Sequence, residues 1–159
     1  MRIYGRRPAT RLEAALYGGI AAIFIAVFAS ELFDYMEIAE RSAMQATLGN
    51  LVAAINTRLA YEVMRGEIGN VSGWPRRNPF ELARASVGNF AGEKDTHALG
   101  GLERGTWAFD AVRGELVYLP RLHRGLVTSD PDGALRFRAI VDLRGFGYRL
   151  EPAPPFRWN

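Results

Sequence analysis

Few side chains in this sequence are of the types that catalyse reactions or bind metal ions. The 159 residues include no Cys and two His, His97 and His123. A disulfide framework, a thiolate metal site and a cysteine nucleophile are therefore excluded, and a histidine-rich metal site is not supported. The sequence shows no serine–histidine–aspartate signature, phosphate-binding glycine loop or HExxH motif. We therefore predict a protein that is not an enzyme and that has no catalytic residues, no cofactor and no metal site.

Two pairs of carboxylates could still do chemistry. Glu37 and Glu40 belong to a stretch of helix-forming residues and are most simply part of a solvated face. Asp130 and Asp132 lie in a turn, where Asp is favoured because its side chain bonds the nearby backbone. A calcium site built from this second pair and a nearby carbonyl is an alternative, although calcium takes roughly six to eight oxygens.

A cluster of basic and aromatic residues is the third candidate site. Trp74, Arg76 and Arg77 are followed closely by Phe80 and Arg84. Such a surface could bind nucleic acid, an anionic surface polymer or a partner subunit. The simpler interpretation is an exposed loop with Trp74 tucked against a helix, and we prefer it.

An uncharged apolar run dominates the N-terminal part of the chain. Residues 14–30 contain no charged side chain, and apolar residues extend the run at both ends. A helix needs roughly 20 such residues to cross a bilayer. Four arginines precede the run and four acids follow it: Arg2, Arg6, Arg7, Arg11, then Glu31, Asp34, Glu37 and Glu40. The positive-inside rule then places the N-terminus in the cytoplasm.

Two other interpretations of the apolar run compete with a membrane anchor. A cleaved signal peptide would have a shorter apolar region, although residues 26–30 resemble a cleavage site. A buried core helix is disfavoured by the uncharged run and its basic flank. We prefer a retained single-pass anchor. With 23% charged and 48% apolar residues, the chain as a whole is neither disordered nor a polytopic membrane protein.

The helix is expected to continue beyond the membrane. No Pro occurs between Pro8 and Pro75, and residues 31–65 are mostly strong helix formers, so we predict one helix from Thr10 to Met64. Gly66 supplies its stop. Apolar residues recur mainly at steps of three and four, at Met36, Ala39, Ala43, Met44, Leu48, Leu51, Ile55, Leu59 and Val63. This stripe could form a coiled coil, but strict heptads are absent, and we prefer docking onto the chain's own sheet.

The remainder of the chain is expected to form loops and then strands. Residues 66–104 are irregular, with a short helix begun by Asn78 as N-cap and Pro79. Four later segments are expected to be strands of two hairpins, residues 105–110, 115–119, 135–142 and 147–151. Five aromatic residues are expected in the core or in cross-strand pairs: Trp107, Phe109, Tyr118, Phe137 and Tyr148. The fold class is therefore α+β, a long helix packed on a small antiparallel meander.

Four segments follow from these expectations. Residues 1–12 form a basic cytoplasmic leader, and residues 13–33 form the transmembrane helix. Residues 34–65 continue that helix in amphipathic form. Residues 66–159 form an extracytoplasmic loop and sheet domain with a Pro-rich tail.

This order of segments resembles a type IV pilin or a type II secretion pseudopilin. The stretch Ala9-Thr10-Arg11-Leu12-Glu13 is similar to the start of a mature pilin, with Thr second and Glu fifth. Four further segments are similar to the loop and first hairpin of minor pilin-like proteins: residues 78–80, 92–93, 105–110 and 114–118. The leader is atypical, because Pro8 stands where the family has Gly. This departure favours a specialised minor subunit.

The resemblance implies a structural role. Cleavage would fall between Pro8 and Ala9, and Glu13 would pair with the N-terminal amine of a neighbouring subunit, although it could instead be an interfacial residue. The implied partners are other pilin-like subunits, inner-membrane assembly proteins and membrane lipid, in the bacterial inner membrane with the C-terminal domain periplasmic or extracted into a filament. The alternative function is a single-pass accessory or sensor protein with an extracytoplasmic binding domain. A membrane-anchored enzyme is a third hypothesis, disfavoured by the missing motifs.

Overall fold

The computed structural model describes residues 10–142 and 147–158. The chain divides into two compact units, Met1–Ile38 and Ala39–Asn159. Its elements in order are α1 (Arg11–Met64), η1 (Ile68–Val71), η2 (Trp74–Arg76), α2 (Pro79–Ala83), β1 (Phe90–Lys94), η3 (Thr96–Gly101), β2 (Thr106–Asp110), β3 (Glu115–Leu119), β4 (Leu126–Val127), β5 (Leu135–Asp142), β6 (Gly147–Pro152) and β7 (Arg157–Trp158).

Helix α1 is a single uninterrupted helix of 54 residues. Its bounds confirm the helix predicted from Thr10 to Met64, apart from Thr10 itself, which stands just before the first helical residue. The helix stops where expected, since Gly66 follows with a φ of 73°, a left-handed conformation that glycine adopts without strain.

The main sheet has five strands in the order β1-β2-β3-β5-β6. The pairs β2–β3, β3–β5 and β5–β6 are antiparallel, which confirms the expected meander. The prediction of an irregular segment is wrong for residues 90–94, which form strand β1. It pairs with β2 in parallel, at the edge of the sheet. Its sequence, Phe-Ala-Gly-Glu-Lys, has no β-branched residue, so its extended form comes from pairing with β2 rather than from local propensity.

A second, two-stranded sheet is formed by β4 and β7. Strand β7 lies in the Pro-rich tail, which had been expected to be only an extension. Trp158 at its end is 7% exposed and belongs to the same core cluster as Met44 of α1. Arg41 adds a hydrogen bond of 2.6 Å from its Nη1 to the backbone oxygen of Trp158. The tail is therefore tied to the helix.

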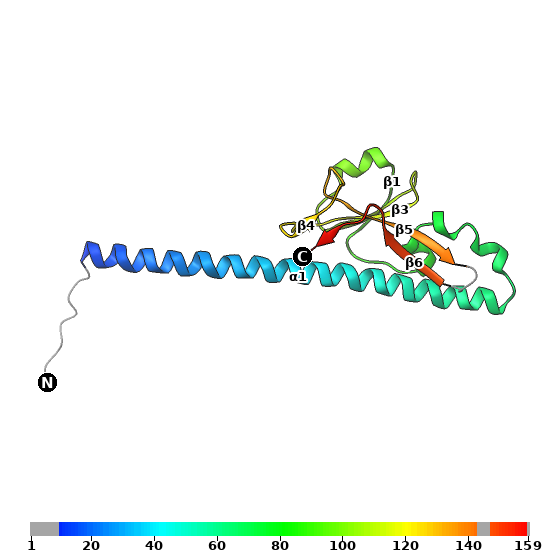
Figure 1. The fold of residues 1–159 in the computed structure, drawn as a ribbon, viewed down its shortest axis with the longest axis horizontal. Helices are drawn as coiled ribbons and strands as arrows, with labels where there is room; N and C mark the ends of the chain where they lie inside the picture. Colours follow the sequence, from blue (N-terminus) through cyan, green and yellow to red (C-terminus); the bar gives the residue numbers. More distant parts are fainter. Residues whose placement is uncertain (1–9, 143–146, 159) are drawn as a thin grey trace, which may run out of the picture. The chain divides into compact units, whose positions relative to one another are not determined.

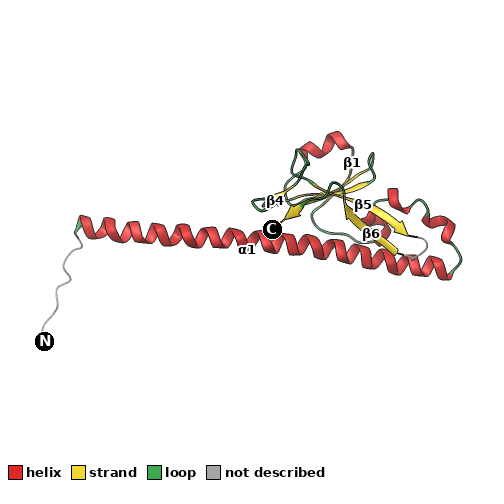
Figure 2. Cartoon of the chain, in the orientation of Figure 1, coloured by secondary structure: helices red, strands yellow, loops and turns green. Residues whose placement is uncertain are grey.

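The C-terminal half of α1 packs against the sheet within unit 2 (Figures 1 and 2). Met44, Leu51, Ile55 and Leu59 are at most 3% exposed and pack in two clusters with residues of β2, β3, β5 and β6. Burial of each such side chain contributes about 1.5–3 kcal/mol. The expected docking of the helix onto its own sheet is therefore confirmed, in preference to a coiled coil.

Part of the predicted apolar stripe was wrong. Ala39 and Ala43 are exposed, and Met36 is 50% exposed. Steps of three and four residues identify a helix face, but they do not show how wide the buried part of that face is. Among the apolar residues of the stripe, burial therefore begins at Met44.

The aromatic core and the second helix agree with the sequence. All five predicted aromatic residues are at most 5% exposed. Trp107 and Tyr118 are paired across β2 and β3, with ring centroids 4.6 Å apart. The side chain of Asn78 accepts a hydrogen bond of 3.0 Å from the backbone N–H of Phe80, which confirms it as the N-cap of α2.

Candidate functional site

The N-terminal half of α1 exposes a long apolar surface. Ile23, Phe24, Ile25 and Phe28 are between 67% and 75% exposed. A shallow hollow between Phe24, Phe28 and Leu32 is almost entirely apolar. Among the described residues, α1 is the one helix that is long and apolar enough to cross a membrane, and its most apolar window has no part buried. An exposed apolar surface of this kind is typical of helices that contact lipid or other helices.

Glu13 lies at the start of this apolar helix. Its carboxylate accepts a hydrogen bond of 2.7 Å from the backbone N–H of Thr10, and the Thr10 hydroxyl accepts one of 3.3 Å from the backbone N–H of Glu13. This reciprocal pair is a capping box, which satisfies two backbone donors at the helix start. Glu13 therefore has a local structural partner in this chain. Pro8 and Ala9, the expected processing site, lie outside the described residues.

The second half of α1 presents a free face of small, uncharged side chains. Exposed positions recur at helical spacing at Ala39, Ala43, Ala46, Gly49, Ala53 and Ala60. Small residues let two helix backbones approach closely. This face lies away from the buried residues Leu51 and Ile55, so one side of the helix holds the sheet and the other is open.

Neither acid of the pair Glu37 and Glu40 lies on a solvated face, contrary to the expectation from sequence: Glu37 is 7% exposed, and Glu40 is bound by the loop after β3. Its Oε1 accepts hydrogen bonds from the Tyr118 hydroxyl at 2.8 Å and from the backbone N–H of Arg121 at 2.7 Å. Its Oε2 accepts one from the backbone N–H of Leu122 at 3.0 Å. Burial, together with this bond to a carboxylate, raises the pKa of Tyr118 above its usual value. Glu40 therefore fastens α1 to the loop after β3.

The basic and aromatic cluster is divided by the fold. Trp74 is 2% exposed, packs with Ile55 and Leu59, and has the Arg58 guanidinium 5.4 Å from its ring centroid. Arg76 and Arg77 are exposed. The tryptophan therefore takes the position tucked against the helix, and it is not available to stack on a ligand.

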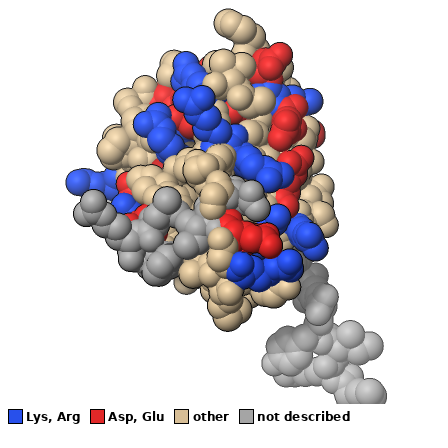
Figure 3. Space-filling model, turned by 90° about the vertical axis from the view of Figure 1, so that its right-hand side faces the viewer, with Lys and Arg blue, Asp and Glu red and all other residues tan. Residues whose placement is uncertain are grey.

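One face of the molecule carries charges of both signs. The face that Figure 3 shows carries Lys and Arg side chains interspersed with Asp and Glu side chains. Binding of a polyanion such as nucleic acid relies on a surface of one sign. This face therefore gives no support to nucleic-acid binding.

The carboxylate of Asp130 forms an ion pair with an arginine and does not belong to a calcium-binding arrangement. Its Oδ2 contacts Nε of Arg136 at 2.6 Å, and its Oδ1 accepts the backbone N–H groups of Asp132 at 3.0 Å and Ala134 at 3.4 Å. Among the described residues, no three His, Cys, Asp or Glu side chains come together as a metal site. The alternative of a calcium ion held by Asp130 and Asp132 is therefore not supported by the geometry.

A buried charge network lies behind this turn. Asp110 is fully buried, and its carboxylate accepts hydrogen bonds from the Thr96 hydroxyl and from the backbone N–H groups of Val112 and Arg113. Nη1 of Arg136 lies 3.5 Å from its Oδ2. Arg136 is thus held between two carboxylates, and the network fastens β5 to the turn after β2.

Sequence analysis missed the polar residues that hold the fold together, namely Glu40, Asn56 and Arg136. The partners of Glu40 lie 78 to 82 positions away in the sequence and that of Asn56 lies 92 away, whereas Arg136 pairs with Asp130 at 6 positions and with Asp110 at 26. A polar residue at the edge of an apolar stripe was the available signal for Glu40, which follows Ala39. Arg136 occupies a polar position of the alternating segment 135–139, as Arg138 does, so the sequence pattern does not distinguish the buried arginine from the exposed one.

Comparisons with models of protein families, with curated proteins and with solved structures found no match. The function of the chain must therefore be argued from its own residues.

Proposed function

We propose that this chain is a structural pilin-like subunit, a pseudopilin or minor pilin of a type II secretion or type IV pilus machine. The observation that carries the proposal is the form of α1. One continuous helix has an apolar first half whose surface is exposed, and a second half packed on a small, mostly antiparallel sheet. The mechanism is assembly rather than catalysis.

The apolar half of α1 would hold the subunit in a membrane and then pack among related helices. Exposed Phe24, Ile25 and Phe28 suit both environments, because lipid and neighbouring helices are equally apolar. The small free face of the second half, at Ala43, Ala46 and Ala53, allows close approach of another subunit. The partners would be other pilin-like subunits, assembly proteins of the inner membrane and lipid.

Glu13 would change partner during assembly. In the single chain its carboxylate is held by the backbone N–H of Thr10. A free N-terminal amine from a neighbouring subunit would compete for the same carboxylate with a full positive charge, which makes the stronger hydrogen bond. Cleavage between Pro8 and Ala9 would create that amine on each subunit.

The basic leader supports an inner-membrane location with the sheet domain in the periplasm. The positive-inside rule depends on arginines close to the apolar run, as at Arg6, Arg7 and Arg11. Extraction from the bilayer into a filament would follow assembly.

Intact mass measurement of the chain from native membranes tests the proposal. We would compare cells with and without a coexpressed prepilin peptidase. Loss of residues 1–8, with or without a methyl group on Ala9, is the expected result. An uncut chain that also fails to copurify with pilus-assembly proteins would refute the proposal.

Site-specific crosslinking gives an independent test, because the chain holds no cysteine and a single introduced thiol reports alone. Ala46→Cys places a thiol on the free face of α1, and Val112→Cys places one at a position that is 71% exposed in the β2–β3 turn. Oxidation in membranes should give disulfide-linked dimers for Ala46→Cys and far fewer for Val112→Cys. Equal yields would mean random collision.

A second candidate is a single-pass accessory or sensor protein. The observation that favours it is an open hollow of about 560 Å³ in unit 2, lined by charged residues and prolines. An uncut anchor together with a ligand that binds this hollow would support this candidate.

A further inference from the structure

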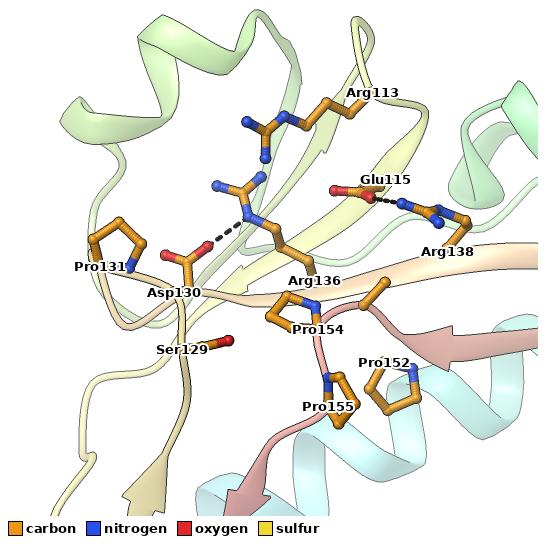
Figure 4. A pocket seen from close by; sticks show the side chains of 11 residues that line it. Arg113, Glu115, Ser129, Asp130, Pro131, Arg136, Arg138, Pro152, Pro154 and Pro155 are labelled. Carbon is orange, nitrogen blue, oxygen red and sulfur yellow. Dashed lines mark hydrogen bonds and ion pairs between the residues drawn. The ribbon is translucent and has the colours of Figure 1, made fainter.

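The hollow in unit 2 lies where three segments meet (Figure 4). The turn between β2 and β3 forms one side, the segment that precedes β5 forms the second, and the segment that follows β6 forms the third. The lining residues fall into three groups, which are the charged side chains Arg113, Glu115, Asp130, Arg136 and Arg138, then Ser129, and then the tail residues 152–155 with Pro131.

The floor of the hollow is rigid. Arg136 is 6% exposed and is held by Asp130 at 2.6 Å and by Asp110 at 3.5 Å. Arg138 contacts Glu115 at 2.7 Å. Arg136 and Arg138 thus have carboxylate partners, and their positions are set before any ligand arrives. A site that is formed in advance loses less conformational entropy when it binds.

Arg113 differs from the other two arginines. It is exposed, and its guanidinium has no hydrogen-bond or ion-pair partner among the described residues. Its backbone N–H is bound to Asp110 at 3.0 Å, the same carboxylate that contacts Arg136. Figure 4 shows the Arg113 side chain extending from the β2–β3 turn toward the guanidinium of Arg136. Arg136 is already paired with Asp110 and Asp130, so Arg113 is the cation at this end of the hollow that remains available to an anion.

Two further features face the same hollow. The Ser129 hydroxyl has no hydrogen-bond partner among the described residues and is directed toward the tail segment in Figure 4. Pro152, Pro154 and Pro155 form the opposite wall. Proline rings are apolar and their backbone φ is fixed, so this wall is stiff. The hollow therefore combines a free cation and a free hydroxyl with an apolar wall, as small-molecule sites do.

We propose that this hollow binds a small ligand that carries an oxyanion group, a carboxylate or a phosphate. Arg113 holds the oxyanion through two parallel N–H donors, and Ser129, on the other side of the Asp130–Arg136 pair, donates a hydrogen bond to a second polar group of the ligand. The apolar part of the ligand lies on the proline wall. The site is separate from the helix surface through which the subunit would assemble, so the two proposals stand independently.

Nuclear magnetic resonance of the arginine side chains tests this site in the full chain in detergent micelles. The chain is labelled with arginine that is enriched in ¹⁵N at Nε, and the Arg113 signal is assigned as the one lost in Arg113→Gln. Sodium acetate, sodium benzoate and inorganic phosphate are the probes, and sodium chloride matches the ionic strength. The expected result is a saturable change in the chemical shift of Arg113 on addition of a carboxylate or of phosphate. The probe that saturates this change at the lowest concentration identifies the oxyanion that the site prefers. Benzoate should saturate at lower concentration than acetate, because its ring packs on the proline wall.

Matched variants decide the outcome. Ser129→Ala should weaken binding several-fold, and Arg77→Gln, which removes an exposed arginine outside the hollow, should leave the Arg113 response unchanged. In Arg113→Gln the remaining shift at Arg136 should need about tenfold more ligand, as loss of a charged hydrogen bond implies. A response that is linear in concentration and equal to that of chloride overturns the proposal, as does an equal weakening by Arg77→Gln.

Discussion

The side-chain amide of Asn56 pairs with the backbone of Tyr148 as a neighbouring strand would. Its Nδ2 donates to the Tyr148 carbonyl oxygen at 3.0 Å, and its Oδ1 accepts from the Tyr148 N–H at 2.7 Å. Strand β6 is the last strand of the sheet, so its outer backbone groups lack a strand partner. The helix therefore covers the sheet edge at this point, which protects it from pairing with another chain.

Replacing Asn56 should destabilise unit 2. Asn56→Ala leaves a part-buried N–H and carbonyl of Tyr148 without partners, so we expect a loss of about 1–3 kcal/mol in the free energy of unfolding. Chemical denaturation of the full chain in detergent measures it. Asn50→Ala, an exposed position on the same helix, is the control and should change the free energy by less than about 0.5 kcal/mol. Similar losses in both variants would show that the amide pairing is unimportant.

Glu40→Gln should loosen the loop after β3. The amide keeps one acceptor oxygen but places an NH₂ group against a backbone N–H, at Arg121 or Leu122. We expect a loss of about 1–3 kcal/mol in the free energy of unfolding. Hydrogen exchange at the amides of Arg121 and Leu122 should rise in the same variant. Glu103→Gln, at an exposed position, is the control, and unchanged exchange in Glu40→Gln would contradict the role of Glu40.

Arg136 and Arg138 should behave very differently although both pair with carboxylates. Arg136→Ala leaves Asp110 and Asp130 buried without a countercharge and should cost about 3–5 kcal/mol. The Arg138 side chain is 62% exposed, but the side chain of its partner Glu115 is only 5% exposed. Arg138→Ala therefore leaves one buried carboxylate without a partner, rather than two, and should cost less, about 1–3 kcal/mol. Thermal unfolding followed by circular dichroism compares them. Equal effects would mean that burial of the network does not determine its energy.

Removing the hydroxyl group of Tyr118 or of Tyr148 should change the free energy of unfolding in different ways. The Tyr148 hydroxyl has no hydrogen-bond partner among the described residues, whereas the Tyr118 hydroxyl donates to Glu40. Tyr148→Phe should therefore leave the free energy of unfolding unchanged or raise it, because it removes an unsatisfied buried group. Tyr118→Phe should lower it by about 0.5–1.5 kcal/mol. Denaturant titration distinguishes the outcomes, and a reversed order would contradict these hydrogen-bond assignments.

Alkaline pH should destabilise unit 2. Burial raises the pKa of both Tyr118 and Tyr148 above the ordinary value of 10.0. The folded state therefore keeps these protons at a pH where the unfolded chain releases them. Their contribution to stability is fully present below pH 10.0 and is lost as pH rises toward the folded pKa values. Unfolding measured between pH 8 and 12 should show this fall, with a smaller slope in Tyr118→Phe and in Tyr148→Phe. Equal slopes in wild type and both variants would contradict it.

Local patterns in the sequence were sufficient for the regular elements. The uncharged run of residues 14–30 and the absence of proline predicted α1 to within one residue, because helix propensity and apolar periodicity are properties of neighbouring residues. The strands of the two hairpins were predicted for the same reason, since hairpins join strands that are close in sequence. The N-cap of α2 at Asn78 was predicted from three consecutive residues, 78–80.

Tertiary structure alone decided which polar groups matter. Glu40 meets Tyr118, Asn56 meets Tyr148, and Arg41 meets Trp158, across separations of 78, 92 and 117 positions. No periodicity encodes such pairs. The same limit applies to β1, which is extended because β2 lies beside it, and to the hollow at Arg113, which exists because three distant segments converge. The sequence by itself determined the helix, the hairpins and the apolar surface, because those depend on local spacing. Packing determined the three long-range hydrogen-bonded contacts and the hollow at Arg113, because these depend on which distant groups are brought together and desolvated.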